Sequence, residues 1–415
     1  MQHRLLAMLA SHVSDLLGRI YILSFVLSIF TNVNAAYGKA FNVVDYGAIG
    51  DGKSNDTWAF EKAWTAICNA WKDTPTMVIP KGKTFLVYPI TFAGPCKSSN
   101  INIKLSGVVK APEDFRAWEA TKMGEWLVFD GVSGLNITGN GLIEGNGKSW
   151  WDNSCKLNPK KGCTKLAPTA LGFRSCNDVR MSRINVMRSP QTHILVLGCK
   201  NVGFSFLVIQ SPGSSPNTDG IHVSDSLNVT VRSSIIGTGD DCISIGDLVS
   251  NIKVKYVNCG PGHGISIGSL GGGGNEVRVE YITVRNVAFD GTSNGARIKT
   301  WQVGEGKVQH VEFSNLTFVN VENPIIIDQY YCQVKGGCRG TKTGVHIDDV
   351  RFTHATGTTA TDVAINLNCS SNVPCTNIYL EDIQLQSTTK GKPVFASCSN
   401  AYGSHKGIVE PKSCV

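Results

Sequence analysis

The feature that most constrains this sequence is a repeat of 22 residues. Asp219, Asp241 and His263 follow one another at that interval, and each precedes a short apolar pattern. The three patterns read Gly-Ile-His-Val, Cys-Ile-Ser-Ile-Gly and Gly-Ile-Ser-Ile-Gly. A fixed period of this length with short β-type segments is typical of a chain wound into stacked coils. Equivalent positions of successive coils then lie about 5 Å apart, the spacing of neighbouring strands.

The rest of the chain fits the same architecture. Short alternating segments between Gly, Asn and Pro turns recur from about residue 101 onward, without helical periodicity. A β-sandwich is the poorer alternative, because it needs turns every 8–12 residues and no in-phase repeat. Near the N-terminus, Phe60, Trp64, Ile67 and Trp71 fall on one helical face after a cap at Asn55 or Asp56. We therefore predict an all-β solenoid of ~22–25-residue coils with an N-terminal capping helix that covers the first coil.

Residues 1–35 are predicted to be a signal peptide, which leaves residues 36–415 as one domain. Ile20 to Phe30 is an apolar stretch preceded by two arginines and followed by small residues near Ala35. The stretch is short for a transmembrane span, and an uncleaved anchor is the alternative. We expect a secreted protein without membrane association once the signal peptide is removed.

The positive net charge of the chain favours an acidic binding partner. The formal net charge is +7, and it falls to +6 when residues 1–35 are removed. A modest positive balance suits either nucleic acid or an acidic polysaccharide. The secretory segment argues against nucleic acid, so an acidic polysaccharide is the expected partner.

The 14 cysteines fit an oxidising compartment. Cys176 and Cys199 are expected to be buried thiols, and no Cys-x-x-Cys cluster indicates zinc. The spacing predicts the disulfides Cys155–Cys163, Cys332–Cys338, Cys369–Cys375, Cys398–Cys414, Cys242–Cys259 and Cys68–Cys96. Glycosylation sequons agree with secretion and begin at Asn55, Asn136, Asn228, Asn315 and Asn368.

The strands that follow the repeated motif predict a groove. Their inward residues are apolar and alternate with outward polar ones. One outward row contains His222, Ser244, Ser266 and Arg297, and the next contains Ser224, Gly246, Gly268 and Lys299. Small polar residues on three coils with two cations at one end predict a groove for an extended anionic ligand.

The acids beside this groove indicate the chemistry. Asp219, Asp241 and His263 stand where each coil turns, and Asp240 has the opposite parity and should project more directly into the groove. Neighbouring carboxylates cannot all ionise freely, so they divide into a proton donor and a base. Glycoside hydrolysis needs such a pair. Ordinary turn chemistry is one alternative, because Asp-Gly and Gly-His-Gly are common turn sequences. A calcium site is another, but Arg297, Lys299 and His263 would repel a metal ion, so we expect none.

Four strings together resemble the signature motifs of the polygalacturonases, glycoside hydrolase family 28. They are Asn217-Thr218-Asp219, Gly239-Asp240-Asp241, Gly262-His263-Gly264 and Arg297-Ile298-Lys299. The resemblance covers essentially the whole mature chain, and plant members are the most similar. It implies a right-handed parallel β-helix that hydrolyses α-1,4-galacturonosyl bonds of polygalacturonate with inversion, without a cofactor, in the plant cell wall or apoplast.

The resemblance also implies a role for each matching residue. Asp240 would be the general acid, while Asp219 and Asp241 would hold and activate water. His263 would tune protonation beside them, and Asn217 would orient its neighbours. The cations Arg297 and Lys299 would bind a galacturonate carboxylate. Tyr331, or alternatively Tyr330, would contact the substrate.

Other functions remain open at this stage. Endo action is expected, and an exo-acting enzyme would differ only in how one end of the groove is closed. A pectate lyase shares the coiled architecture but uses calcium and β-elimination. A non-catalytic wall protein would bind the polymer without cleaving it. A monomer is the default expectation for the oligomeric state.

Overall fold

The computed structural model describes residues 40–71, 74–118, 124–156, 167–332, 338 and 341–415. The expected signal peptide at residues 1–35 lies outside these ranges, and so does Cys163, the expected partner of Cys155. Among the described residues, every helix is too short or too polar to cross a membrane.

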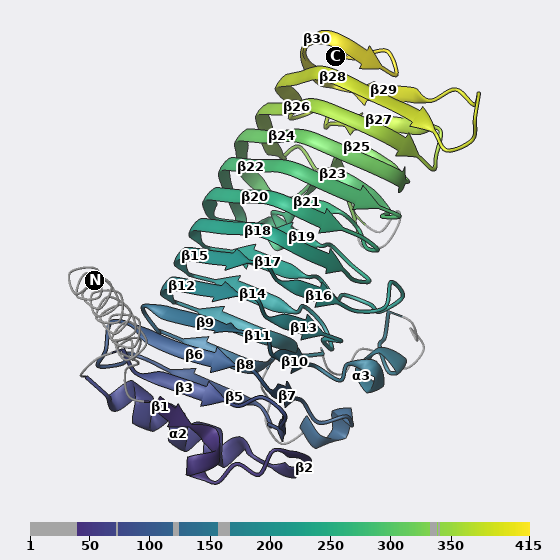
Figure 1. The fold of residues 1–415 in the computed structure, drawn as a ribbon. Coiled ribbons are helices and arrows are strands. Elements are labelled where there is room, and N and C mark those ends of the chain that lie inside the picture. Colours follow the sequence, from purple (N-terminus) through teal and green to yellow (C-terminus); the bar gives the residue numbers. More distant parts are fainter. Residues whose placement is uncertain (1–39, 72–73, 119–123, 157–166, 333–337, 339–340) are drawn as a thin grey trace, which may run out of the picture.

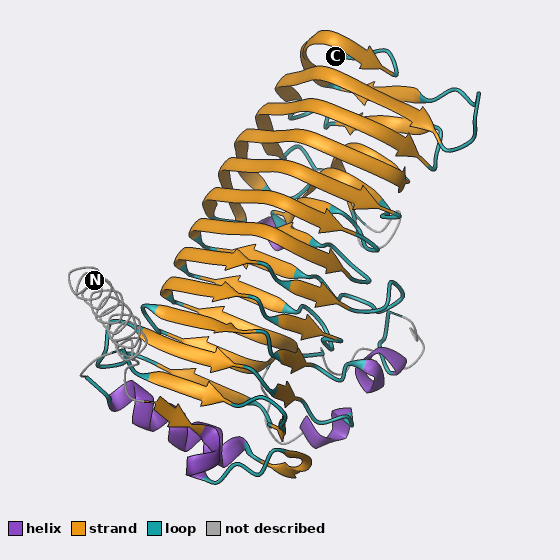
Figure 2. Ribbon diagram, in the orientation of Figure 1, coloured by secondary structure: helices purple, strands orange, loops and turns teal. Residues whose placement is uncertain are grey.

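The described chain winds into a stack of coils in which all neighbouring strands pair in parallel (Figures 1 and 2). One face of the stack is an 11-stranded sheet, which contains the predicted motif strands. Its strands are β5 (Ile90–Ala93), β8 (Glu125–Asp130), β11 (Thr169–Arg174), β14 (Ile194–Leu197), β17 (Ile221–Ser224), β19 (Ile243–Ile245), β21 (Ile265–Leu270), β23 (Asn294–Trp301), β25 (Asn323–Tyr331), β27 (Val363–Asn368) and β29 (Phe395–Ser399).

The remaining strands form a 19-stranded sheet that wraps around the other sides of the coils. In the earlier coils it has two separate strands per coil, and from β18 onward these merge into single long strands. Its strands are β1 (Ala40–Asn42), β2 (Asp51–Asn55), β3 (Thr76–Ile79), β4 (Thr84–Leu86), β6 (Ile101–Leu105), β7 (Val108–Lys110), β9 (Leu135–Gly139), β10 (Leu142–Glu144), β12 (Asn177–Ser182), β13 (Asn185–Met187), β15 (Lys200–Ser205), β16 (Val208–Gln210), β18 (Leu227–Gly237), β20 (Val249–Cys259), β22 (Glu276–Asp290), β24 (Glu305–Val321), β26 (Val345–Thr359), β28 (Cys375–Ser387) and β30 (Ala401–Glu410).

The predicted parallel β-helix is confirmed, but the predicted coil length is correct only for the middle of the stack. Ile221 pairs with Ile243 and Ile243 with Ile265, which are steps of 22 residues. Ile265 pairs with Ala296 and Ile325 with Ile365, which are steps of 31 and 40 residues. The extra residues lie in the turns between strands, so they lengthen a coil without changing the pattern of its strands.

The apolar ladders predicted for the inside of the coils form the core. Ile221, Ile243, Ile265 and Ala296 occupy one register position on four successive strands, and all are fully buried. Burying such side chains contributes about 1.5–3 kcal/mol each, so the ladder fixes the register by which the motif residues meet.

The N-terminal end of the stack is covered by α2 (Thr57–Asn69), as predicted. Its Phe60 packs edge-on against Phe85, and its Trp64 against Phe92 and Phe129. Of the two predicted caps, Asn55 accepts a hydrogen bond at its Oδ1 from the amide of Thr57 at 3.0 Å. The carboxylate of Asp56 instead accepts hydrogen bonds from the backbone of the preceding turn. Within the described ranges the other short helices are α3 (Lys148–Asp152), η1 (Val43–Tyr46), η2 (Phe115–Trp118) and η4 (Gly272–Gly274).

Five of the predicted disulfides join two described residues each, and they fasten the cap, one coil in the middle of the stack and the C-terminal coils. They are Cys68–Cys96, Cys242–Cys259, Cys332–Cys338, Cys369–Cys375 and Cys398–Cys414. Cys176 and Cys199 are buried thiols, as predicted.

Candidate active site

The motif residues meet because β17, β19, β21 and β23 are neighbouring strands in register. His222 pairs with Ser244, Ser244 with Ser266 and Ser266 with Arg297, so the predicted outward row is continuous. The second predicted row is broken, because the register shifts after Ile267 and Leu270 pairs with Thr300. Lys299 therefore does not continue a regular row from Gly268.

Backbone hydrogen bonds hold the corners that carry the acids. The amide of Gly220 donates to the carbonyl of Asp241 at 2.9 Å, and that of His263 donates to Asp240 at 2.8 Å. At Gly239 a Cβ would lie 1.9 Å from the carbonyl oxygen of Ser215. Only glycine allows this close approach, which places the two aspartates that follow.

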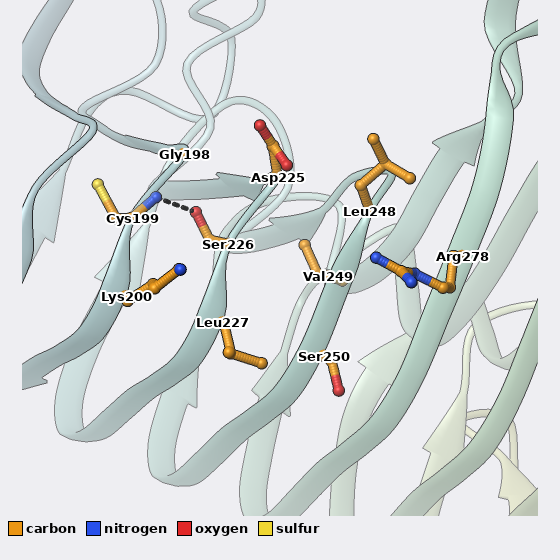
Figure 3. Close-up of a pocket in the computed structure, with 10 residues that line it drawn as sticks. All are labelled: Gly198, Cys199, Lys200, Asp225, Ser226, Leu227, Leu248, Val249, Ser250 and Arg278. Carbon is orange, nitrogen blue, oxygen red and sulfur yellow. Dashed lines mark hydrogen bonds between the residues drawn. The ribbon is translucent and has the colours of Figure 1, made fainter.

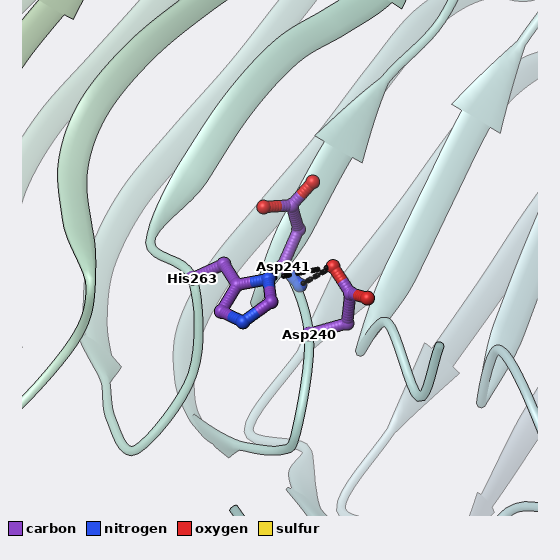
Figure 4. A group of neighbouring side chains, drawn as sticks. All are labelled: Asp240, Asp241 and His263. Atoms are coloured by element: carbon purple, nitrogen blue, oxygen red, sulfur yellow. Dashed lines mark hydrogen bonds and ion pairs between the residues drawn. The ribbon is translucent and has the colours of Figure 1, made fainter. Parts of the chain in front are cut away.

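Asp240 is held by His263 (Figure 4). Its Oδ1 lies 2.9 Å from Nδ1 of His263 and accepts a bond from the amide of Asp241 at 3.0 Å. Its Oδ2 lies 3.4 Å from Nζ of Lys156, a residue that the sequence analysis missed. The Asp240 side chain is 12% exposed, compared with 2% for that of Asp241. The parity argument placed the two side chains in this order.

Asp241 is buried between two cations. Its Oδ1 accepts from Nη2 of Arg297 at 2.6 Å and from Oγ of Ser266 at 2.8 Å. Its Oδ2 accepts from Nζ of Lys299 at 3.0 Å. Ser266 also accepts a bond from Nε of Arg297 at 2.8 Å, so the floor of the groove fixes both the acid and the guanidinium.

Asp219 is half-buried and held from two sides. Its Oδ2 accepts a 2.6 Å bond from Ser244, whose Oγ also lies 2.7 Å from Nδ1 of His222. Its backbone carbonyl oxygen is 2.9 Å from Nδ1 of the fully buried His193. Burial lowers the pKa of His193 to about 4. Ser244 and Ser266, which we predicted as small floor residues, are hydrogen-bonding partners of two different acids.

The three carboxylates do not share their protons equally. Burial, together with the charges of Asp240 and Asp241, raises the pKa of Asp219 to about 8. Burial also raises the pKa of Asp240, but the hydrogen bond and charge of His263 and the charges of Lys156 and Lys299 outweigh it and lower that pKa below its ordinary value. Near pH 6 Asp219 is therefore protonated, whereas Asp240 is ionised.

The raised pKa of Asp219 predicts a pH-dependent stability. In the folded protein Asp219 keeps a proton that it releases above about pH 4 in the unfolded chain. The stabilisation of the folded state by this proton is complete below pH 3.8 and is lost as the pH rises through about 8. After allowance for solvent screening, the loss from pH 4 to pH 8 is about 2 kcal/mol. We expect Asp219→Asn to melt at a higher temperature than the parent at pH 8 and at a similar temperature at pH 4. Melting curves at both pH values measure this, with exposed Asp225→Asn as the control; equal melting temperatures at pH 8 would contradict it.

The remaining predicted site residues divide into two groups. Tyr331 lies beside the site, with its ring centre 5.3 Å from Nζ of Lys299 and 5.4 Å from the ring of Trp301. Tyr330 instead accepts a bond at its hydroxyl from the amide of Ser371. Asn217 is exposed, and its side chain has no hydrogen bond within the described part of the chain, so a role in orienting its neighbours has no contact to support it.

Three of the side chains also have the composition of a metal site. One ligand atom each from Asp240, Asp241 and His263 lies within 4.8 Å of the others. The oxygens of Asp241 are already bonded to Arg297 and Lys299, and an ammonium lies beside Asp240. These cations oppose a metal ion, so the donor set fits one poorly.

Comparisons with known proteins agree with the geometry. The family model described as glycosyl hydrolases family 28 matches residues 68–411. A polygalacturonase of Malus domestica is 43% identical over 380 residues, which are 91% of this chain and 80% of that protein. Polygalacturonase-2 of Solanum lycopersicum is 42% identical over 90% of this chain and 80% of its own length.

The fold of this chain is also found in solved structures of other proteins. An endo-xylogalacturonan hydrolase from Aspergillus tubingensis superposes with a TM-score of 0.76 at 23% identity, covering 89% of this chain and 100% of that one. A polygalacturonase from Erwinia carotovora gives a TM-score of 0.71 at 21% identity, covering 89% and 97%.

Proposed function

The chain belongs to the glycosyl hydrolases of family 28, and from this premise we propose that it is a pectin-degrading polygalacturonase that cleaves α-1,4-galacturonosyl bonds inside polygalacturonate with inversion. The observation that supports this most is the gathering of Asp219, Asp240 and Asp241 on adjacent coils, with Arg297 and Lys299 beside them. The enzyme acts outside the cell, in the plant cell wall.

In this proposal Asp240 protonates the leaving glycosidic oxygen. It is more exposed than Asp241, and His263 fixes its orientation. Asp219 and Asp241 hold the water that attacks the sugar carbon, and Asp241 is the most deeply buried of the three acids. The pKa of Asp240 is lowered in the free site, so the acid must gain its proton when substrate binds. A sugar that displaces the ammonium of Lys156 and brings its own carboxylate near Asp240 raises that pKa.

The cations can bind a substrate carboxylate while holding Asp241. Arg297 uses Nε for Ser266 and Nη2 for Asp241, which leaves the hydrogens of Nη1. Lys299 donates one bond to Asp241 and retains two further donors. Tyr331 lies over this ammonium and offers a ring against which a sugar can pack. The substrate contact of Asn217 rests on its exposure alone.

Mixing the protein with polygalacturonate at mildly acidic pH tests the activity and its mode. We expect new reducing ends together with an early fall in viscosity, because internal cuts shorten the polymer at once. New reducing ends without an early fall in viscosity indicate exo action. The proposed endo mode is then wrong, while the proposed hydrolysis stands. Unsaturated products that absorb in the ultraviolet and disappear with a chelator indicate a lyase. Binding without any cleavage indicates a non-catalytic wall protein and overturns the proposal.

A further inference from the structure

We propose that the protein has a second binding surface for acidic polysaccharide, on a side of the β-helix away from the catalytic groove. It is formed by the outward residues of β12, β15, β18 and β20, and we call it the cationic face. Its position follows from the coil: each strand of the catalytic sheet leads through a turn into one of these strands, so the two surfaces are different sides of the same coils.

The cations of this face stand in rows set by the strand register. Arg232 of β18 pairs with Lys255 of β20, and Lys255 pairs with Arg285 of β22. Neighbouring strands lie about 4.8 Å apart, so the row presents three positive charges along the stack. In the adjacent row, Thr230 separates Arg180 and Gly203 from Lys253. A Cβ on Gly203 would lie 3.0 Å from Cδ of Arg180, so the Arg180 side chain lies along this row.

The charges of the face have few anionic partners. Within the described residues, Arg232, Lys253 and Lys255 form no ion pair, and Arg285 pairs with Glu312. The nearby carboxylate of Asp178 accepts a hydrogen bond from Asn201 at 3.1 Å. In the catalytic groove, by contrast, the cations Arg297, Lys299 and Lys156 each contact an aspartate.

The shape of the face suits an extended chain. Beside the strands lies a hollow of about 600 Å³ lined by Arg180, Arg232, Lys253, one acid (Asp178) and polar and apolar residues of four successive coils. At its edge, Phe206 is 47% exposed, and the guanidinium groups of Arg183 and Arg232 lie 5.5 and 5.7 Å from its ring centre. An aromatic surface beside cations offers both a packing surface for a sugar ring and charge for its carboxylate.

A smaller hollow of about 340 Å³ continues the face around the turn (Figure 3). Lys200 and Arg278 stand at its two sides, with the carboxylate of Asp225 at its upper end in that view. Lys200 directly precedes Asn201 of the larger hollow, so the two hollows adjoin.

Charge complementarity selects the occupant. A linear polymer with one carboxylate per sugar matches rows of cations that run along the stack and in which Arg232, Lys253 and Lys255 have no ion pair within the described residues. Polygalacturonate is that polymer, and naming it rests on the proposed function. Held on this face, one segment of a chain would raise the local concentration of other segments at the groove. Short oligomers cannot reach both surfaces, so they gain nothing from it.

The test compares two triple variants of the full chain. Arg232→Ser/Lys253→Ser/Lys255→Ser removes charge from the face, and Lys53→Ser/Lys81→Ser/Lys412→Ser removes the same charge from exposed sites at the two ends of the stack. Both are produced in a bacterium that does not add N-glycans, because the sequon at Asn228 lies within the face. Equal melting temperatures establish that both variants are folded.

We expect the face variant to bind immobilised polygalacturonate about ten-fold more weakly at low salt and to elute at lower salt than the parent and the control. All three proteins should cleave short oligogalacturonides with the same kcat/KM, and none should be retained on fully esterified pectin. Equal retention of the two variants on polygalacturonate overturns the second surface, and so does retention of the parent on esterified pectin that is as strong as its retention on polygalacturonate. Failure of the parent to cleave the short oligomers overturns the proposed function instead, and leaves the binding comparison intact.

Discussion

Replacing Asp240 by asparagine should lower kcat on polygalacturonate by about a thousand-fold, because positioned general acids contribute about 10²–10⁴-fold to such reactions. The amide keeps the size of the carboxyl group and can still accept the bonds from His263 and from the amide of Asp241. It cannot donate the proton that the leaving oxygen needs. KM should change little, because the lost interaction forms only in the transition state. Initial rates of reducing-end release over a range of substrate concentrations separate the two constants.

The matched control for this change is Asp225→Asn, which removes one exposed carboxylate just after the end of β17, whereas Asp240 precedes the start of β19. It should keep nearly full activity. A melting curve of Asp240→Asn that overlays that of the parent confirms that the fold is unchanged. If Asp240→Asn retains more than about a tenth of the parental kcat, Asp240 is not the general acid.

The position of the acids could be predicted because a solenoid converts sequence period into spatial proximity. The 22-residue interval and the parallel pairing of the strands that follow were enough to predict that Asp219, Asp241 and His263 lie close together. The apolar ladders gave the register, and the parity of Asp240 gave its greater exposure. These inferences concern backbone position, which a regular pattern specifies.

What the pattern could not specify lies in turns and side-chain rotamers. Lys156 reaches Asp240 from a loop 84 residues earlier in the chain, and its flanking sequence contains no repeat. The coil lengths after His263 were wrong because insertions in turns leave the strand pattern unchanged. The bonds of Ser244 and Ser266 to different aspartates depend on the rotamers of two hydroxyl groups that the sequence marks only as small and polar.

The second large effect is expected at Lys299, which serves both Asp241 and the substrate. Replacing it by methionine keeps the packing against Tyr331 but removes the ammonium 3.0 Å from Oδ2 of the buried Asp241. Truncating one partner of a buried charge pair costs about 2–5 kcal/mol. We therefore expect kcat/KM on polygalacturonate to fall by about 10²–10³-fold.

The two roles of Lys299 predict different signatures in the kinetic constants. If the ammonium binds a galacturonate carboxylate, KM rises, and the loss is smaller for an oligomer whose carboxylates are methyl esters. If it only holds Asp241, kcat falls equally for both substrates. Lys299→Arg keeps the charge and should recover part of kcat/KM, whereas Lys253→Met, an equal change at an exposed site on another side of the coils, should leave it unchanged on short oligomers. Wild-type kcat/KM in Lys299→Met would contradict both roles, because a buried carboxylate that loses one of its two cations cannot keep the same protonation and position.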